Sequence, residues 1–245
     1  ENRLRGFQIY DFDEDAYRYY SGLVDRLGRS AKYQLLGDFF RKQNVKGIDS
    51  LVPAIRSKMG GITYYSFTIE PSKLLKMGYI LHRINANNDM MPTYQRLINP
   101  QRLTAIRKFV NEGNYFPNSL IVSIDTDGKD LQFDKAQDSC QVKDSVATVG
   151  ILHLPQKYQS IYVIDGQHRL YGYSESEHAD KDCIPVVAFV NLDKDKQVKM
   201  FMDINENQKK VSKDLRNTLN IDLLWESHIP AQRNTSLFLY IAEEF

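Results

Sequence analysis

The sequence predicts a mixed α+β domain, because two hydrophobic patterns alternate along the chain. Some segments place apolar side chains three or four residues apart, as an amphipathic helix does, and short runs of β-branched and aromatic residues typical of strands separate them. Glycine and proline mark most of the changes between the two patterns. With 245 residues, of which 42% are hydrophobic and 26% charged, the chain can bury a substantial core.

The first 60 residues are predicted to form a helical N-terminal region. Aromatic residues and leucines recur at helical spacing in residues 16–20 and 33–40. Glycines 60 and 61 mark the end of this region. A strand over residues 62–69 and a short helix from Pro71 to Met77 are predicted to follow, with Gly78 ending the helix.

Residues 61–213 are predicted to form one domain in which helices and strands alternate. Asn99 before Pro100 is an N-cap arrangement, so we expect a helix over residues 100–111. The segment 146–154 is predicted to be a strand at the edge of the sheet, because Pro155 follows it. The other predicted elements are strands at 119–124, 160–164 and 184–190, helices at 168–176 and 195–204, and a helical C-terminal region over 214–245.

Composition excludes several classes of protein. A net charge of +1 argues against DNA binding by bulk electrostatics, although a local basic patch is compatible with it. Cys140 and Cys183 lack CxxC spacing, so neither a disulfide framework nor a zinc site is predicted. The absence of a long apolar run and of a signal-peptide pattern predicts a cytoplasmic protein that makes no membrane contact. The chain begins at Glu1 and stops within an apolar run, so we expect it to be part of a longer gene product.

The segment 163–173 concentrates the chemistry of the chain. An apolar run, residues 161–164, ends in Asp165-Gly166, and Gln167-His168-Arg169 then opens a predicted helix. An acid, a glycine and two potential cations therefore converge at a helix N-terminus, which favours bound anions. The chain has no GxxxxGK[ST] loop, so a nucleotide site here would not be of the Walker type.

Each residue of this segment has a chemical role open to it. Arg169 can donate two parallel hydrogen bonds to phosphate oxygens, and His168 can donate to phosphate or carry a proton near neutral pH. Gln167 can position a water or bind a phosphate oxygen, and Gly166 allows the backbone to approach a ligand closely. Asp165 can hold Mg²⁺ through a water or simply cap the helix, and both interpretations stay open.

Two further groups of polar residues are candidates for the same site. Asn205, Glu206, Asn207 and Gln208 follow a predicted amphipathic helix and suit a Mg²⁺-phosphate unit, with Glu206 as a second candidate ligand to Mg²⁺. The alternative interpretation of these four is a solvated helix end. Arginines 96 and 102 flank the Asn-Pro helix start, and spacing does not choose between them.

The motif and its surroundings resemble a known family. Residues 165–169 spell DGQHR, and the segments 96–102, 116–119 and 201–213 fit in the same order. The chain is similar to the DGQHR-domain family, which includes DndB of the DNA phosphorothioation clusters, over roughly residues 50 to 225. The resemblance implies a ParB/sulfiredoxin-like core, a group whose members commonly bind a nucleoside triphosphate.

ParB-like proteins also suggest where the nucleotide site would close. In them an asparagine-containing element follows the central motif, and Asn205, Asn207 and Gln208 are similar to it. An arginine just before the first core helix reaches phosphate there, a role that the resemblance gives to Arg96 or Arg102.

Two classes of function follow. The first is a nucleotide-binding protein, an Mg²⁺-dependent NTPase using ATP or another NTP, that works in a bacterial DNA-modification or defence system of the phosphorothioation kind. The alternative is a non-enzymatic, DNA-binding transcriptional regulator of the DndB type. Its contacts would come from Arg26, Arg29 and Lys32, or from a second group, Lys209, Lys210, Lys213 and Arg216. In both cases we expect DNA as a partner, directly or through other proteins of the system, and leave an oligomer open. Sulfiredoxin-like phosphoryl transfer is disfavoured, because the motif lacks a cysteine.

Overall fold

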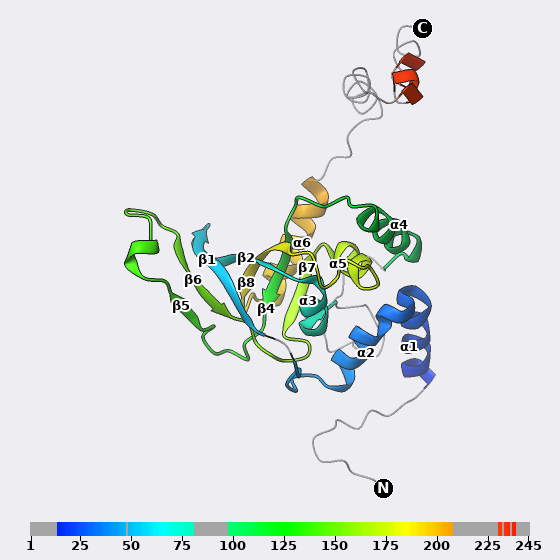
Figure 1. The fold of residues 1–245 in the computed structure, drawn as a ribbon. Helices are drawn as coiled ribbons and strands as arrows, with labels where there is room; N and C mark the ends of the chain where they lie inside the picture. Colours follow the sequence, from blue (N-terminus) through cyan, green and yellow to red (C-terminus); the bar gives the residue numbers. More distant parts are fainter. Residues whose placement is uncertain are drawn as a thin grey trace. The chain divides into compact units, whose positions relative to one another are not determined.

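The computed structural model describes residues 14–47, 49–80, 98–207, 230–231, 233–235 and 237–238. By contact the chain divides into two compact units, residues 1–201 and 202–245. The described elements are mixed α and β, which confirms the predicted class (Figure 1). The described helices are α1 (Glu14–Leu27), α2 (Ala31–Phe39), α3 (Pro71–Met77), α4 (Pro100–Asn111), α5 (Gln167–Tyr173) and α6 (Lys194–Asn207). Among the described helices, none has both the length and the apolar character needed to cross a bilayer.

Eight strands form one sheet in the order β3-β7-β4-β8-β2-β1-β6-β5. Strand β7 lies between β3, to which it runs parallel, and β4, to which it runs antiparallel, while β4 is parallel to β8. The pairs β8–β2, β2–β1, β1–β6 and β6–β5 are all antiparallel. The strands are β1 (Leu51–Met59), β2 (Ile62–Ile69), β3 (Gly78–Tyr79), β4 (Leu120–Ile124), β5 (Phe133–Lys135), β6 (Thr148–His153), β7 (Ile161–Asp165) and β8 (Ile184–Val190).

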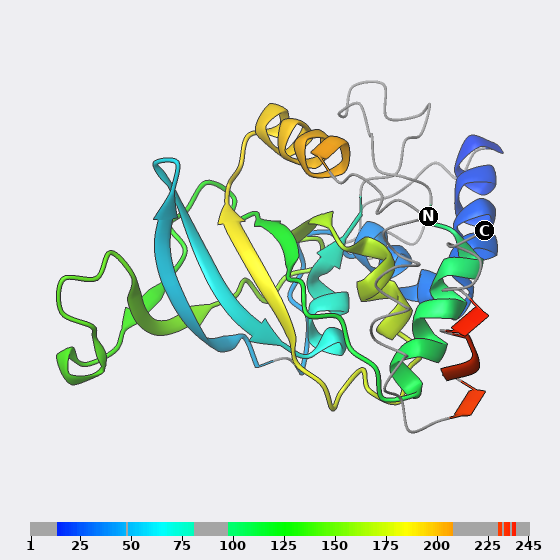
Figure 2. The same cartoon turned by 90° about the horizontal axis from the view of Figure 1, so that it is seen from above.

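The main core lies on one face of the sheet, under helices α1 to α5. Buried residues from these helices, such as Leu23, Leu74 and Val110, form one cluster with inward residues of the strands, such as Val122 and Val186. Figure 2 shows α3, α4 and α5 gathered on this side of the sheet. A smaller cluster on the other face contains Tyr162, Ile164, Phe189 and Leu192, with Met200 and Phe201 from the start of α6 packed against it. Strand β7 is therefore covered on both faces, and its four consecutive apolar residues are buried.

Two local predictions were wrong. Residues 51–59, which we placed in the helical N-terminal region, form strand β1, in which exposed and buried residues alternate over residues 51–55. Pro53 pairs in register with Ile151 inside the sheet, although proline is uncommon in an inner strand. Strand β6 does not lie at the edge, because the short strand β5 pairs with its outer side. The predicted division of the chain at residues 60 and 213 stays a prediction.

Candidate functional site

The motif lies where strand β7 turns into helix α5. Asp165 is the last residue of β7, Gly166 is the N-cap of α5, and Gln167, His168 and Arg169 form its first turn. Gly166 has φ +94°, in the left-handed region that a side chain rarely adopts. A Cβ at this position would lie 2.9 Å from Arg169 Nη2 and closer still to Leu120 Cδ2. Glycine is therefore required here for both its conformation and its size.

Arg169 fastens this turn to the start of strand β4. Its Nη1 donates to the carbonyl oxygen of Asn118, and its Nη2 donates to the carbonyl oxygen of Ser119 at 3.1 Å and to Asp165 Oδ2 at 3.1 Å. Only 14% of the side chain is exposed. Burial lowers the pKa of the Arg169 guanidinium, the neighbouring Asp165 carboxylate opposes that shift, and the charge of Arg102 adds to it.

These contacts bear on two expectations for the motif, and the phosphate-binding role of Arg169 stays a prediction. We expected the Arg169 guanidinium to donate to phosphate oxygens. In this structure it donates to backbone carbonyl oxygens of the protein itself, because the segment that leads into β4 passes directly beside α5. Asp165 does not cap the helix: α5 has no side-chain cap, and the Asp165 carboxylate pairs with Arg169. Because Arg169 already balances its charge, Asp165 is at most one ligand to a metal that phosphate oxygens also hold.

His168 joins helix α5 to helix α4. Its Nε2 accepts a hydrogen bond from the backbone N–H of Asn99 at 3.2 Å, so in this arrangement the neutral ring carries its proton on Nδ1. Asn99 is the N-cap of α4, as predicted, and its Oδ1 accepts from the N–H groups of Gln101 and Arg102. Gln167 and His168 are both buried. The bond between His168 and Asn99 thereby holds the starts of the two helices side by side. The catalytic roles of Gln167 and His168 stay predictions.

Arg102 is the predicted phosphate contact that the structure leaves accessible. It occupies the first turn of α4, its side chain is exposed, and its charge is close enough to act on the pKa of Arg169. Arg96 and Gln208 lie outside the described residues. Asn205, Glu206 and Asn207 form the last residues of α6, in the second unit, and their part in the site stays a prediction.

Sequence reasoning missed a buried polar group behind the motif, because it assigned no chemistry to the apolar face of the N-terminal helices. Ser30 hydrogen-bonds Ser174 just after α5, and Gln34 Nε2 of α2 donates to the Tyr171 hydroxyl. Asp38 accepts from Gln159, and burial raises its pKa to about 6. The signal available in the sequence was weak, since a glutamine and an aspartate within an apolar helix face were its only marks.

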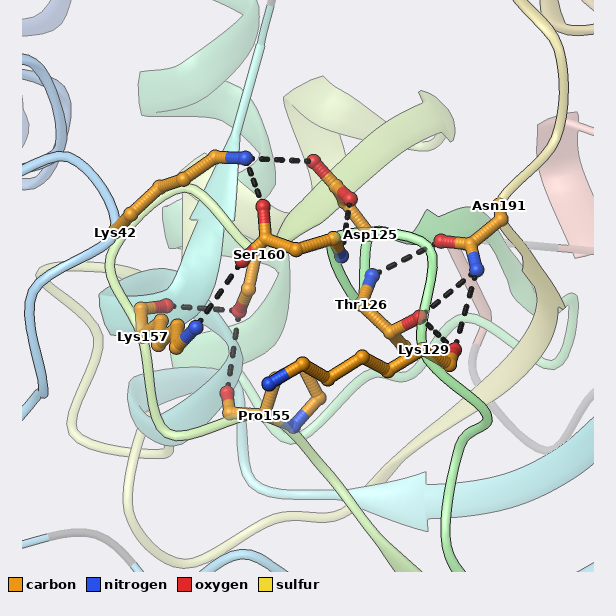
Figure 3. A network of polar contacts seen from close by, with 9 residues as sticks. Lys42, Asp125, Thr126, Lys129, Pro155, Lys157, Ser160 and Asn191 are labelled. Atoms are coloured by element: carbon orange, nitrogen blue, oxygen red, sulfur yellow. Dashed lines mark hydrogen bonds and ion pairs between the residues drawn. The ribbon is translucent and has the colours of Figure 1, made fainter.

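A second polar network lies at the opposite end of β7 from the motif. Lys42 and Lys157 both pair with Asp127, and Lys42 also lies 3.8 Å from Asp125. Asn191 bonds Thr126 through both ends of its amide and so fixes the turn after β4 (Figure 3). The two lysines lower the pKa of Asp127. Because two carboxylates balance two ammonium groups, this network fits a structural role better than an anion site.

Within the described residues no group of three or more His, Cys, Asp or Glu side chains is arranged to hold a metal ion. The chain's own residues therefore fit a Mg²⁺ ion only if phosphate oxygens supply most of its ligands, as is common for Mg²⁺ bound with nucleotides.

One solved structure to which the chain is similar is the C-terminally truncated chromosome-partitioning protein ParB from Caulobacter crescentus, complexed with CTP-γ-S. The identity is 10% and the TM-score 0.35, over 66% of this chain and 63% of that chain, less than two thirds of its length. At that score the likeness supports neither a fold assignment nor a ligand. No curated protein gives a significant match.

A family model, in contrast, covers most of the chain. The model for DndB, described as DNA-sulfur modification-associated, matches residues 52–221. This range contains the whole sheet apart from Leu51, together with the motif and helices α3 to α6. The chain therefore belongs to the DndB family, which is associated with DNA-sulfur modification.

Proposed function

We propose that this chain is a nucleotide-binding protein of a DNA-sulfur modification system, and that it holds the nucleotide phosphates beside the starts of helices α4 and α5. The observation that carries the proposal is the pairing of these helix starts through the bond from the Asn99 N–H to His168 Nε2. A helix N-terminus carries a partial positive charge that favours anions, and the bond between Asn99 and His168 holds these two N-termini side by side.

Arg102 is the side chain proposed to bind phosphate. It is exposed in the first turn of α4, on the same side as the motif, and a guanidinium gives charge-assisted hydrogen bonds to phosphate oxygens. Asp165 would contribute to a Mg²⁺ ion that the phosphates bring with them. ATP, CTP, GTP and UTP are all candidates, and NTP hydrolysis is proposed as a further step with Gln167 or His168 placing the water.

Calorimetry with the four nucleotides, with and without Mg²⁺, tests the proposal. Arg102→Ala should weaken binding by about 10- to 100-fold, because one charge-assisted contact contributes roughly 1.5–3 kcal/mol. Lys108→Ala is the matched control, since Lys108 also projects from α4 but near its last turn, paired only with the exposed Glu112. Folded protein that gives no heat with any of the four nucleotides would end the proposal. Release of inorganic phosphate measures hydrolysis separately.

The second candidate is a DNA-binding regulator, which the exposed Arg29 and Lys32 at the junction of α1 and α2 favour. Arg26 is half-buried nearby, and Lys209, Lys210, Lys213 and Arg216 lie outside the described residues. If Arg26, Arg29 and Lys32 each contact one phosphate, the logarithm of the DNA affinity should fall with the logarithm of the salt concentration with a slope of about −3. A mobility-shift series in salt, with Arg29→Ala/Lys32→Ala beside the wild type, separates this function from the first.

A further inference from the structure

The outer face of strands β6, β1 and β2 exposes an apolar patch. This face points away from the main core, and six large apolar side chains on it each leave 37–50% of their surface exposed. The registers bring them together, since Ile55 lies opposite Val149, Pro53 opposite Ile151 and Met59 opposite Ile62. The six are Leu51, Ile55, Met59, Ile62, Val149 and Ile151, and we call them the β1 patch.

Among the described residues, none covers the β1 patch as the rest of this face is covered. Over strands β8, β4 and β7 the outer residues are buried in the second cluster, with Met200 and Phe201 packed against them. Strands β1, β5 and β6 extend away from the helices in both views (Figures 1 and 2). The solvated face of an antiparallel sheet normally carries polar side chains, so an apolar face of this kind marks an interaction surface.

The charges on this face restrict the kind of partner. On β1, β5 and β6 the outward ionisable residues are Asp134 and His153, which pair with each other at 2.6 Å. The basic residues of β1 lie on the opposite face, where Arg56 sits 5.1 Å from the centre of the Phe133 ring. A face without an unpaired cation offers nothing to nucleic acid. Asp134 is the one outward carboxylate on these strands and it is hydrogen-bonded to His153, so an identical face meets little like charge.

We propose that a second copy of this chain packs on the β1 patch, so that the two sheets face each other about a two-fold axis. Such an interface is self-complementary, because each copy presents the same apolar centre and the same hydrogen-bonded pair, Asp134 and His153. The six exposed side chains present roughly 500 Å² per copy, so two copies bury about 1,000 Å² from these residues alone, enough for a specific interface. Facing sheets pack about 10 Å apart, a spacing that interdigitated Ile, Val and Leu side chains fill.

Sedimentation velocity and light scattering of the full chain, across a wide range of concentration, test the proposal. The wild type should have twice the 28.4 kDa mass of the chain. Ile55→Lys places a charge at the centre of the patch and opposite its own copy, and should weaken the dimer by about 100-fold or more. Val146→Lys is the matched control, because it makes a similar apolar-to-Lys change at an 85% exposed position in the loop before β6. This control should stay dimeric.

Circular dichroism establishes that each variant is folded. If Ile55→Lys fails to fold, Ser57→Lys on the same face of β1 replaces it, since that residue is already polar and half-buried. A wild type that stays monomeric at its highest soluble concentration overturns the proposal. So does a dimer that persists unchanged in a folded patch variant, because its interface must then lie elsewhere. Neither result bears on nucleotide binding, which uses other residues.

Discussion

Replacing Gly166 with alanine tests whether the motif turn is as constrained as its geometry indicates. The residue has φ +94°, and an added Cβ would meet both Arg169 Nη2 and the buried side chain of Leu120. A left-handed conformation costs a non-glycine residue roughly 1–2 kcal/mol, and overpacking a filled interior costs about 1–3 kcal/mol more. Gly166→Ala should therefore lower the free energy of unfolding by about 2–5 kcal/mol.

Two other glycines separate these costs. Gly113 has φ +83° with open space around it, so Gly113→Ala should show the conformational cost alone, roughly 1–2 kcal/mol. Gly172 is helical, and a Cβ there would lie 2.8 Å from Ile106 Cβ, so Gly172→Ala should show the cost of overpacking between α4 and α5, offset by a gain in helix propensity of about 1 kcal/mol. Urea unfolding followed by circular dichroism gives all three values. If Gly166→Ala were no more destabilising than Gly113→Ala, Leu120 and Arg169 would have to move aside freely, and the tight junction inferred here would be wrong.

Three further substitutions test other parts of the site. Arg169→Ala should lower the free energy of unfolding by about 1–3 kcal/mol, because two carbonyl groups and the Asp165 carboxylate lose their donor; unchanged urea stability would contradict the structural role of Arg169. His168→Phe should lower the free energy of unfolding by about 1–3 kcal/mol, because the N–H of Asn99 loses its acceptor. Thermal unfolding can measure this change. The third concerns Asp38, whose pKa is raised from 3.8 to about 6, so the folded chain holds the proton more tightly than the unfolded chain. The free energy of unfolding of the wild type should then fall as the pH rises from about 4 to 6, by at most about 3 kcal/mol, and Asp38→Asn should remove this pH dependence. An equal pH dependence in the variant would show that another group titrates.

The parts of the fold that were predicted from sequence are those fixed by neighbouring residues. Helix α4 was predicted with its observed bounds, because Asn99, Pro100 and the apolar spacing act within a few residues of one another. Strand β2 and helix α3 were predicted correctly for the same reason. Strand β1 was not, because its alternation only becomes evident once β2 and β6 lie on either side of it. The three-residue strand β5 is too short to leave a period in the sequence.

The sequence predicted where the motif lies in the fold, but not the contacts that its residues make. The motif does lie at a strand–helix turn, as the sequence indicated. The partners of Arg169, however, are Asn118 and Ser119, which are about fifty residues away in the chain. The contacts of Ser30 and Gln34 with the end of helix α5 span more than a hundred residues. The spacing of residues along the sequence does not indicate such long-range contacts. An arginine that binds phosphate therefore cannot be told from one that binds a backbone carbonyl group of a distant segment.

The geometry of the motif assigns its residues to a different task from the one that their chemistry suggests. Gly166, His168 and Arg169 each contact or closely approach β4 or the start of α4, so three of the five motif residues fix the spacing between strand β7 and its neighbours. A side chain engaged in this way is not available to grip a ligand without loosening the fold. We therefore expect the direct phosphate contact to come from an accessible residue beside the motif, of which Arg102 is the described example. The motif would thus act as the support of a binding site, and substitutions in it would reduce stability and binding together, whereas substitutions at Arg102 would reduce binding alone.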